Sequence, residues 1–376
     1  MINIDVLIVG GGPSGSSLGY LLQKNGYSCC IVDKCSFPRM KLCGGLLTKK
    51  TTSLINSIYG EINFPYECTS SNVNIFLGTH KISSVSTDSN FYLVERYDFD
   101  HYLIKKYKET SGLLYENSKL TSIDVNQNTA VINNTEEISY KILVGADGAN
   151  SQIRKFIDAK YRPNTLCLEC NYPSKNIKDD INIYLSFVRS GYAWCFPKKN
   201  HYNVGIGGLT KKNKNLKSTF ISFLKTGNME IPEREIKGAM IPVGEYVKKP
   251  CKDNILLVGD AAGLVDSITG EGIYFALLSA KYAYNSIDDS LKNNLVLSKR
   301  YLGRISHIQA KIRDANFFNK VYFNDSIKSS LVKLVDGRKT MIKYVCDNLI
   351  SEYNVSYSKF PFHYLKERKN IKRVSG

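Results

Sequence analysis

Glycine residues near the start of the chain are spaced in a way that suits phosphate binding. Residues 6–9 form a continuous apolar run, which is typical of a strand buried on both faces. The glycine-rich segment 10–15 follows directly, and a helix with its leucines on one side is predicted from Ser16 to Lys24. Such a turn lets a pyrophosphate approach the backbone at the positive end of a helix. The residues predicted to form this turn are Gly10, Gly12, Pro13, Ser14 and Gly15.

An acidic residue then follows at the distance that a dinucleotide site requires. A second apolar strand is predicted at residues 28–32, and Asp33 follows it, 18 positions after Gly15. A carboxylate in this position accepts hydrogen bonds from the hydroxyls of the adenosine ribose. Strand, glycines, helix, strand and acid occur in the expected order, so we predict a dinucleotide site that also includes Lys34.

Two later segments indicate which dinucleotide binds. Asp147 follows a predicted strand and lies in a Gly-Ala-Asp-Gly sequence, and Gly259 and Asp260 follow the apolar run 255–258. A nicotinamide dehydrogenase needs neither segment. Together with the first motif they resemble the fingerprints of flavoproteins related to p-hydroxybenzoate hydroxylase, over residues 1 to about 283. The resemblance implies FAD as the cofactor, with Asp260 at its ribityl chain.

The same resemblance implies further cofactor contacts. Arg96 begins a loose match to the family pattern R-x-x-F-D-x-x-L, whose Arg lies over the phosphate and ribityl region. The alternative is an Arg at the surface end of a helix. The segment that includes Gly270, Gly272 and Ile273 opens an apolar helix, whose N–H groups would face the flavin pyrimidine edge. Relatives usually have Pro where this chain has Ser267, so the rigidity of this turn is open.

A loop and a strand narrow the resemblance. Residues 38–45 match the P-R-x-K-x-C-G-G segment of the geranylgeranyl reductase family. In that family the loop runs beside the isoalloxazine ring, which places Arg39, Cys43 and Gly44 at the cofactor. Cys43 is either a proton donor or gate near flavin N5, or only a small residue between tight glycines. A thiol with a reference pKa of about 8.5 is protonated at neutral pH and can give a proton.

The strand is the Y-x-W-x-F-P pattern at residues 192–197, which lines the substrate cavity in the same family. Alternation along a strand puts Tyr192, Trp194 and Phe196 on one face. Either they line a cavity or they form a stripe that packs the sheet. Flavin halogenases have W-x-W-x-I-P here, and single-component hydroxylases usually lack the Cys-Gly-Gly loop, so both are disfavoured.

The resemblance therefore implies an FAD-dependent oxidoreductase that reduces carbon–carbon double bonds of an apolar, geranylgeranyl-type prenyl substrate. Reduced flavin would pass a hydride to the double bond, with NAD(P)H or another reductant as the electron donor. The alternative is a flavin-dependent monooxygenase that hydroxylates or epoxidises a hydrophobic or aromatic substrate. A third reading is a flavoprotein that no longer turns over.

The predicted fold is α/β, with a discontinuous Rossmann-type FAD-binding domain at residues 1–60, 90–155 and 240–290. An inserted substrate domain with an antiparallel sheet is expected at residues 61–89 and 156–239, with its clearest strands at 181–188, 192–198 and 203–207. Residues 291–376 are expected to form a C-terminal helical region with a basic tail.

Composition bounds the remaining possibilities. Of 376 residues, 43% are hydrophobic and 23% are charged, which excludes a disordered, fibrous or coiled-coil protein. We find no signal peptide and no transmembrane-length apolar run, so we expect a cytoplasmic protein with reduced thiols. Cys167 and Cys170 form a lone C-x-x-C, and the histidines show no metal spacing, so no metal site is expected.

The net charge of +17 suggests an anionic partner or reflects only a lysine-rich composition. A basic helix at residues 328–343 and the tail 366–373 would either contact an anionic membrane peripherally or form a solvated face. No recognised nucleic-acid-binding motif accompanies the charge, so we expect a small-molecule or lipid substrate and no nucleic acid.

Overall fold

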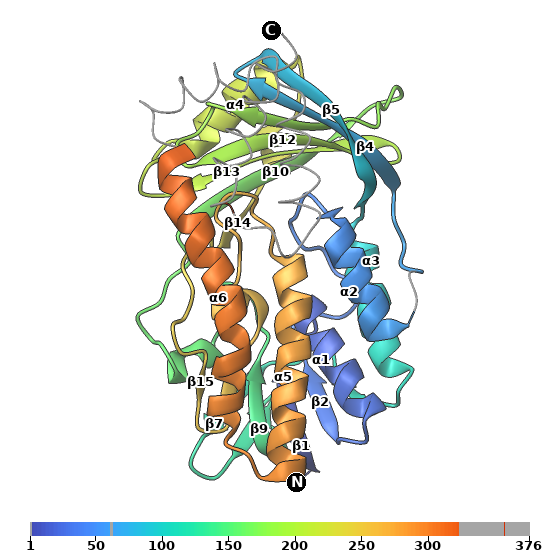
Figure 1. Cartoon of the computed structure of the whole chain (residues 1–376). Helices are drawn as coiled ribbons and strands as arrows, with labels where there is room; N and C mark the ends of the chain where they lie inside the picture. Colours follow the sequence, from blue (N-terminus) through green and yellow to red (C-terminus); the bar gives the residue numbers. More distant parts are fainter. Residues whose placement is uncertain (1, 61–62, 323–356, 358–376) are drawn as a thin grey trace, which may run out of the picture.

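Over the residues that the structure describes, the chain forms two eight-stranded sheets with helices packed around them. The computed structural model describes residues 2–60, 63–322 and 357. In Figure 1 the second sheet lies across the top, and the first sheet with its helices occupies the lower half. The helices are α1 (Pro13–Lys24), α2 (Lys49–Tyr59), α3 (Arg96–Lys108), α4 (Leu216–Thr226), α5 (Ile273–Asn293) and α6 (Leu297–Tyr322).

The first sheet is built on parallel strands in the order β16-β9-β1-β2-β6. β7, β8 and β15 extend it by antiparallel pairing. Its strands are β1 (Ile2–Val9), β2 (Cys29–Val32), β6 (Leu113–Tyr115), β7 (Leu120–Asp124), β8 (Thr129–Ile132), β9 (Glu136–Gly145), β15 (Cys251–Lys252) and β16 (Ile255–Leu257).

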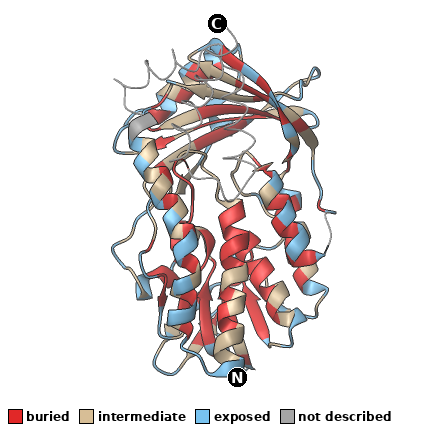
Figure 2. Cartoon of the chain, viewed as in Figure 1, coloured by how far each residue is buried: buried red, intermediate tan, exposed pale blue. Residues whose placement is uncertain are grey.

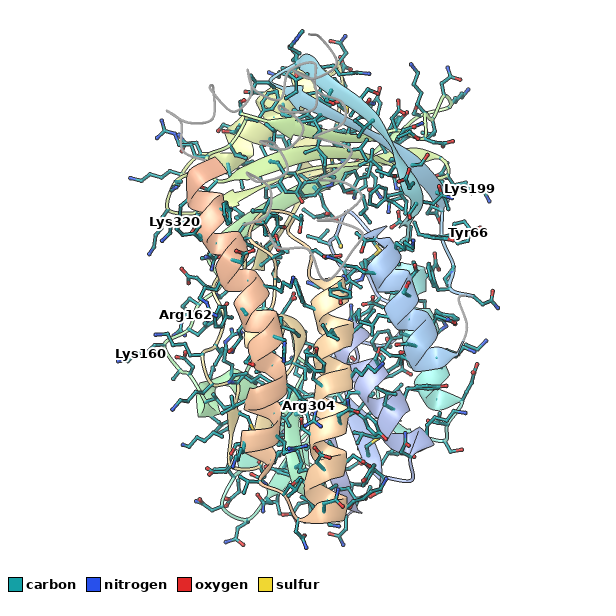
Figure 3. All side chains as sticks on the ribbon, viewed as in Figure 1. Tyr66, Lys160, Arg162, Lys199, Arg304 and Lys320 are labelled. Atoms are coloured by element: carbon teal, nitrogen blue, oxygen red, sulfur yellow. The ribbon has the colours of Figure 1, made fainter. Side chains whose placement is uncertain are left out.

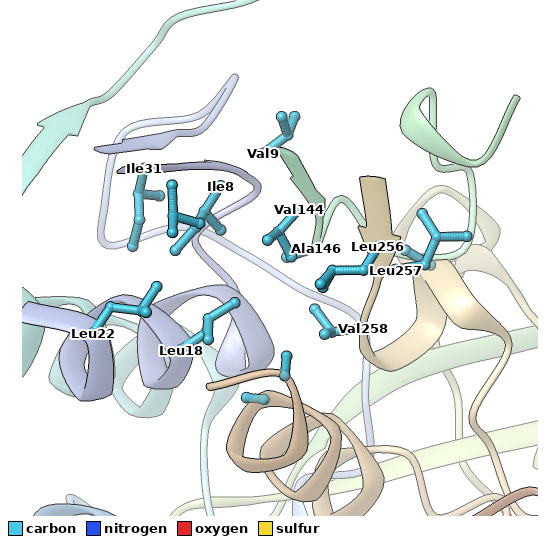
Figure 4. Packing of buried hydrophobic residues seen from close by; sticks show 14 of the residues in the cluster. Ile8, Val9, Leu18, Leu22, Ile31, Val144, Ala146, Leu256, Leu257 and Val258 are labelled. Atoms are coloured by element: carbon cyan, nitrogen blue, oxygen red, sulfur yellow. The ribbon is translucent and has the colours of Figure 1, made fainter. Parts of the chain in front are cut away.

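The core of this sheet explains why its strands read as unbroken apolar runs. Residues 6–9, 29–32 and 255–257 are all buried, because helices cover the parallel strands. Leu18 and Leu22 of α1 lie against Ile8 and Ile31 of the sheet (Figure 4). Figure 2 shows that the first turns of α5 are buried as well. The apolar periodicity of α1 therefore fixes which side of the helix meets the sheet.

α1 begins three residues before the predicted start at Ser16. Its first residue is Pro13, which fits the first turn of a helix because the missing N–H would have no partner there. The predicted strand at residues 6–9 is confirmed as part of β1, and the predicted strand 28–32 is confirmed as β2, which begins one residue later, at Cys29. The helix thus starts directly at the glycine-rich turn.

The second sheet has the order β14-β10-β13-β12-β11-β4-β5-β3. Helix α4 covers one face, where Phe220 and Phe223 pack against Val204 and Ile206 of β13. The opposite face carries Trp194 and looks toward the first sheet (Figure 1). Its strands are β3 (Leu46–Leu47), β4 (Cys68–Leu77), β5 (His80–Leu93), β10 (Thr165–Pro173), β11 (Ile181–Leu185), β12 (Gly191–Pro197), β13 (His201–Leu209) and β14 (Lys237–Ile241).

The predicted fold class is confirmed, with two differences in detail. The second sheet is not wholly antiparallel, because β4 and β11 pair in parallel, with Val73 opposite Ile181. The predicted boundaries at residues 90 and 240 fall inside β5 and β14, since pairing of β5 with β4 continues to Leu93. A local pattern cannot show either feature, because both depend on which distant strand is the neighbour.

The expected C-terminal helical region is described only in part. α5 and α6 account for residues up to 322, and α6 packs beside α5 (Figure 1). The predicted basic helix 328–343 and the tail 366–373 lie outside the described residues. Within residues 2–60, 63–322 and 357, we find no helix that is both long and apolar enough to cross a membrane.

Candidate active site

The glycine-rich turn connects β1 to α1 and is tightly packed on two sides. Gly10 has a φ of +104°, and a Cβ atom on it would overlap the backbone of Ala146. A Cβ atom on Gly15 would overlap the carbonyl oxygen of Gly10. At Gly12 the space is open, and the nearest atom to an added Cβ is Nη2 of Arg39 at 3.4 Å. The turn is thus compact, but its backbone is approachable at Gly12.

The start of α1 has unsatisfied hydrogen-bonding capacity. Its N-cap residue is Gly12, which supplies no side-chain cap to the first N–H groups. Ser14 in the first turn is buried, and its Oγ would lie 3.0 Å from a Cβ on Gly259. Gly259 itself donates its N–H to Ser279 Oγ at 2.9 Å. The first motif and the third motif therefore meet at this helix end.

The three motif aspartates all follow strands of the first sheet at its carboxyl edge. Asp33 follows β2, Asp147 follows β9 and Asp260 follows β16. These strands run parallel, so their carboxyl ends lie at one edge, where ligands bind in open α/β sheets. The structure thus brings together three segments that are more than 100 residues apart in sequence.

The three carboxylates differ in their hydrogen bonds. Asp33 accepts the N–H of Gly11 at 2.7 Å and that of Cys35 at 2.9 Å, so it braces the glycine turn as well as following it. Asp147 accepts the N–H of Gln152 at 2.6 Å, and burial raises the pKa of its carboxyl. Among the described residues, no hydrogen bond reaches the side chain of Asp260. The sequence anticipated the acids but not the bracing role of Asp33.

Two arginines share one buried carboxylate beside the glycine turn. Arg96, the first residue of α3, is buried and donates to Asp100 from Nε at 2.6 Å and from Nη2 at 2.8 Å. Arg39 Nη1 lies 3.3 Å from the same carboxylate. Two guanidinium groups with one carboxylate leave a net positive charge next to Gly12, which suits a pyrophosphate. By contrast, the predicted site residue Lys34 is exposed.

The Cys-Gly-Gly loop packs against the aromatic strand β12. A Cβ atom on Gly44 would lie 2.8 Å from the Phe196 ring and 3.2 Å from Trp194 Nε1. Gly45 is buried with a φ of +67°. The two segments that carried the family resemblance in the sequence are therefore in contact in space.

The aromatic strand is also anchored to the rest of the site. Trp194 is only 8% exposed, donates its N–H to Asn203 Oδ1 at 2.8 Å, and lies over Gly205, where a Cβ atom would overlap the indole. The Tyr192 hydroxyl donates to the carbonyl of Thr269 at 2.5 Å, next to Gly270. The three aromatic side chains thus pack in the core and also border the flavin-side turn. The same residues can therefore pack the sheet and line a substrate cavity.

The turn before α5 is closed by side-chain hydrogen bonds, although it has Ser267 where the family resemblance leads us to expect a proline. Asp266 Oδ1 accepts the N–H groups of Ile268 at 2.8 Å and Thr269 at 2.9 Å, which closes a local turn. At the other end, Gly272 is the N-cap of α5 and supplies no side-chain cap to Ile273 and the following residues. The carboxylate of Asp266 therefore closes the turn that contains Ser267.

Glu271 in the same turn was not singled out from the sequence. Its Oε2 lies 2.5 Å from Nζ of Lys50, and its Oε1 accepts the hydroxyl of Thr48 at 2.9 Å. Burial raises the pKa of the Glu271 carboxyl. These contacts tie α2 to the start of α5, and no spacing pattern in the sequence pairs residue 50 with residue 271.

A second group of buried charges was also missed. Glu169 on β10 is 8% exposed, and its Oε1 accepts the N–H of Cys43 at 3.0 Å. Burial raises the pKa of Glu169 to about 7. Lys198 is 1% exposed and donates to the carbonyl of Val94 at 2.6 Å, while burial lowers its pKa. Glu169 lies within the C-x-x-C segment, which is not expected to bind a metal. Alternation along the strand was the signal that could have placed its side chain on the same face as that of Cys167.

Neither a metal cluster nor the open surface pocket contributes to this site. No cluster of three or more His, Cys, Asp or Glu side chains within the described ranges could hold a metal ion. An open pocket of about 390 Å³ is lined by residues 158, 160–164, 210–211 and 245, and none of the predicted site residues lines it.

The geometry fits FAD. The open backbone at Gly12, the uncapped start of α1 and the paired arginines suit a pyrophosphate. The carboxylate of Asp260, which accepts no hydrogen bond from the described part of the chain, suits a hydroxylated chain. FAD would be held by the three motifs along the carboxyl edge of the first sheet. The fold and the site thus define an FAD-binding oxidoreductase.

Comparisons with known proteins give the family. Residues 3–208 match the family model described as FAD binding domain. An uncharacterized protein of Methanosarcina barkeri is 33% identical over 80% of this chain and 80% of its own. Digeranylgeranylglycerophospholipid reductase 2 of Methanosphaera stadtmanae is 29% identical over 75% of this chain and 77% of its own. The chain belongs to the geranylgeranyl reductase family of FAD-dependent oxidoreductases, which confirms the resemblance drawn from the sequence.

A solved structure shares the fold. The crystal structure of a geranylgeranyl bacteriochlorophyll reductase-like protein from Thermoplasma acidophilum superposes with a TM-score of 0.74 at 22% identity. The match covers 98% of this chain and 99% of the other. The arrangement of both sheets and the helices is therefore that of a known FAD-binding fold.

Proposed function

We propose that this protein reduces carbon–carbon double bonds in an apolar, geranylgeranyl-type prenyl substrate. The observation that carries the proposal is the contact of the Cys43–Gly44 loop with Trp194 and Phe196, because it joins the expected flavin side of the site to an aromatic, apolar surface. The relative from Methanosphaera stadtmanae is named for reduction of a geranylgeranyl lipid. An apolar chain would gain by burial against such a surface.

When bound and reduced, FAD supplies the hydride for such a reaction. The chain's own residues bind and orient: Arg39 and Arg96 place positive charge at the glycine turn, and the start of α5 presents uncapped N–H groups. Tyr192 and Trp194 are fixed by hydrogen bonds to Thr269 and Asn203, so their rings offer a rigid wall. NAD(P)H or another two-electron reductant is the proposed source of electrons.

The alternative function is a flavin-dependent monooxygenase acting on a hydrophobic or aromatic substrate. The two functions separate on their use of molecular oxygen, since a double-bond reductase needs none. The test is to incubate the flavin-loaded protein with a geranylgeranyl lipid and NADPH or dithionite under anaerobic conditions. Mass spectrometry should then show product that has gained pairs of hydrogen atoms. Unchanged lipid without oxygen, with an oxygenated product in air, would contradict the proposal and support a monooxygenase.

The proposed substrate is a small molecule or a lipid, and peripheral contact with an anionic membrane remains part of the proposal. Lys160, Arg162 and Lys320 point outward on one side of the molecule in Figure 3, and Lys199 on the other. Lys160 and Arg162 lie in one loop, whereas Lys199 and Lys320 lie elsewhere in the chain. The segments proposed for this contact are the basic stretches 328–343 and 366–373, which lie outside the described residues.

A further inference from the structure

We propose that the carboxyl group of Glu169 supplies the proton that completes double-bond reduction, an inference that rests on the proposed function. Saturating a carbon–carbon double bond adds a hydride from reduced FAD to one carbon and a proton to its neighbour. In the proton step the O–H bond of Glu169 breaks, a C–H bond forms and a carboxylate remains. The flavin is left oxidised, and the carboxylate regains its proton from solvent before the next turnover.

Glu169 lies on the aromatic face of the second sheet. In the register of this sheet Glu169 is opposite Gly205, and Gly205 is opposite Trp194. Directly opposite residues in antiparallel strands point to the same face. Because Gly205 has no side chain, the indole of Trp194 occupies the space between the two strands. The carboxyl of Glu169 on β10 is thus on the same face as Tyr192 and Trp194, the proposed wall of the substrate site. It lies next to β13, over which the indole extends.

The carboxyl also touches the loop that the family resemblance places beside the flavin ring. Its Oε1 accepts the N–H of Cys43 at 3.0 Å, which fixes the orientation of the carboxyl group. Oε2 accepts no hydrogen bond from any of the described residues. One oxygen is therefore held by the loop, and the other is available to carry a proton. Cys43 Sγ is in turn an acceptor for the N–H of Gly45 at 3.4 Å.

The surroundings of Glu169 favour a group that exchanges its proton near neutral pH. Burial raises its pKa to about 7, and the negative charge of Glu95 acts in the same direction. Lys198 and Lys41 and the hydrogen bond from Cys43 oppose this rise. The charge of the carboxyl also acts on two cysteines of the same strand and raises the pKa of their thiols. These are Cys167 on its own face and Cys170 on the opposite face. General acids work best when the pKa is close to the working pH.

The decisive variant is Glu169→Gln, because the amide oxygen can still accept the N–H of Cys43 but the side chain has no proton to give. Glu235→Gln is the matched control, since Glu235 is exposed. Both variants should bind FAD and accept electrons from dithionite as the unmodified protein does. Reoxidation of the reduced flavin by a geranylgeranyl lipid without oxygen should slow about 10²- to 10⁴-fold in Glu169→Gln alone.

A second measurement does not depend on turnover. Infrared difference spectra of the flavin-loaded protein, recorded as the pH is raised through 7, should show loss of a protonated-carboxyl band. This band should persist in Glu235→Gln and be missing from Glu169→Gln. If Glu169→Gln fails to bind FAD, the infrared titration is made on the flavin-free forms of both proteins. A protonated-carboxyl band near pH 7 that is absent from the unmodified chain, or that is unchanged in Glu169→Gln, overturns the proposal.

The remaining outcomes are also distinct. If the unmodified protein oxidises its flavin with the lipid and Glu169→Gln does so at the same rate, Glu169 only anchors the loop and the proton inference fails alone. If Cys43→Ala abolishes the reaction while Glu169→Gln retains it, the thiol is the proton donor. If no form reacts with any prenyl lipid, the proposed function fails and this inference with it.

Discussion

Replacing Glu169 with Gln should change how the stability of the protein depends on pH. Burial raises the pKa of Glu169 from 4.5 to about 7. Between those values the folded chain keeps a proton that the unfolded chain has released, so the free energy of unfolding falls as the pH rises. A rise of about 2.5 pH units at about 1.4 kcal/mol per unit corresponds to about 3 kcal/mol. Gln does not titrate, so the free energy of unfolding of the variant does not fall for this reason as the pH rises.

The assay is thermal or urea unfolding of flavin-free protein, with Glu169→Gln compared with the unmodified chain at each pH. Taking the difference removes the contribution of every other titrating group. The difference in unfolding free energy should shift by about 3 kcal/mol in favour of the variant between pH 4 and pH 8. For a chain of 376 residues this is a change of about 4 °C in the melting-temperature difference. A difference that stays constant over this range would refute a buried carboxyl with a raised pKa.

Three further substitutions test the site. Gly15→Ala should abolish FAD binding, measured as the flavin-to-protein ratio of the purified protein, because its Cβ would overlap the backbone of the glycine turn. The control Gly303→Ala should keep that ratio, because the space around Gly303 is open. Asp100→Asn should weaken FAD binding at least about tenfold in a fluorescence titration and lower the melting temperature, because the buried guanidinium of Arg96 and the partly buried one of Arg39 lose their shared carboxylate. Unchanged binding would contradict this role. Trp194→Ala should reduce prenyl-substrate turnover and leave FAD bound, and loss of FAD instead would show that Trp194 serves as core for the cofactor domain.

The cofactor half of the molecule was predictable because its signals are local. A buried strand, a turn at Gly10 and a helix that starts at Pro13 are adjacent in sequence, and each has its own composition. The aspartates follow strand ends, so parallel pairing alone brings them together. Even here the bracing of the turn by Asp33 depended on seeing which N–H groups it accepts.

The substrate half was less predictable because its contacts depend on sheet register. The parallel pairing of β4 with β11 joins residues about 100 positions apart. The placement of Glu169 beside Cys43 spans 126 positions and depends on Gly205 leaving room for the indole. Lys198 is buried and its ammonium reaches a backbone carbonyl, although lysine side chains are usually exposed. Such features follow from neighbours that no local pattern specifies.

The most direct test of the proposed double-bond reductase is a single-turnover measurement of the flavin without oxygen. The purified holoprotein is reduced with a stoichiometric amount of dithionite, mixed with a geranylgeranyl lipid, and its flavin absorbance is followed. We expect the oxidised flavin spectrum to return with the lipid and not with a saturated lipid of the same headgroup. A flavin that stays reduced with both lipids and reoxidises only when air is admitted would contradict reduction of double bonds by this protein.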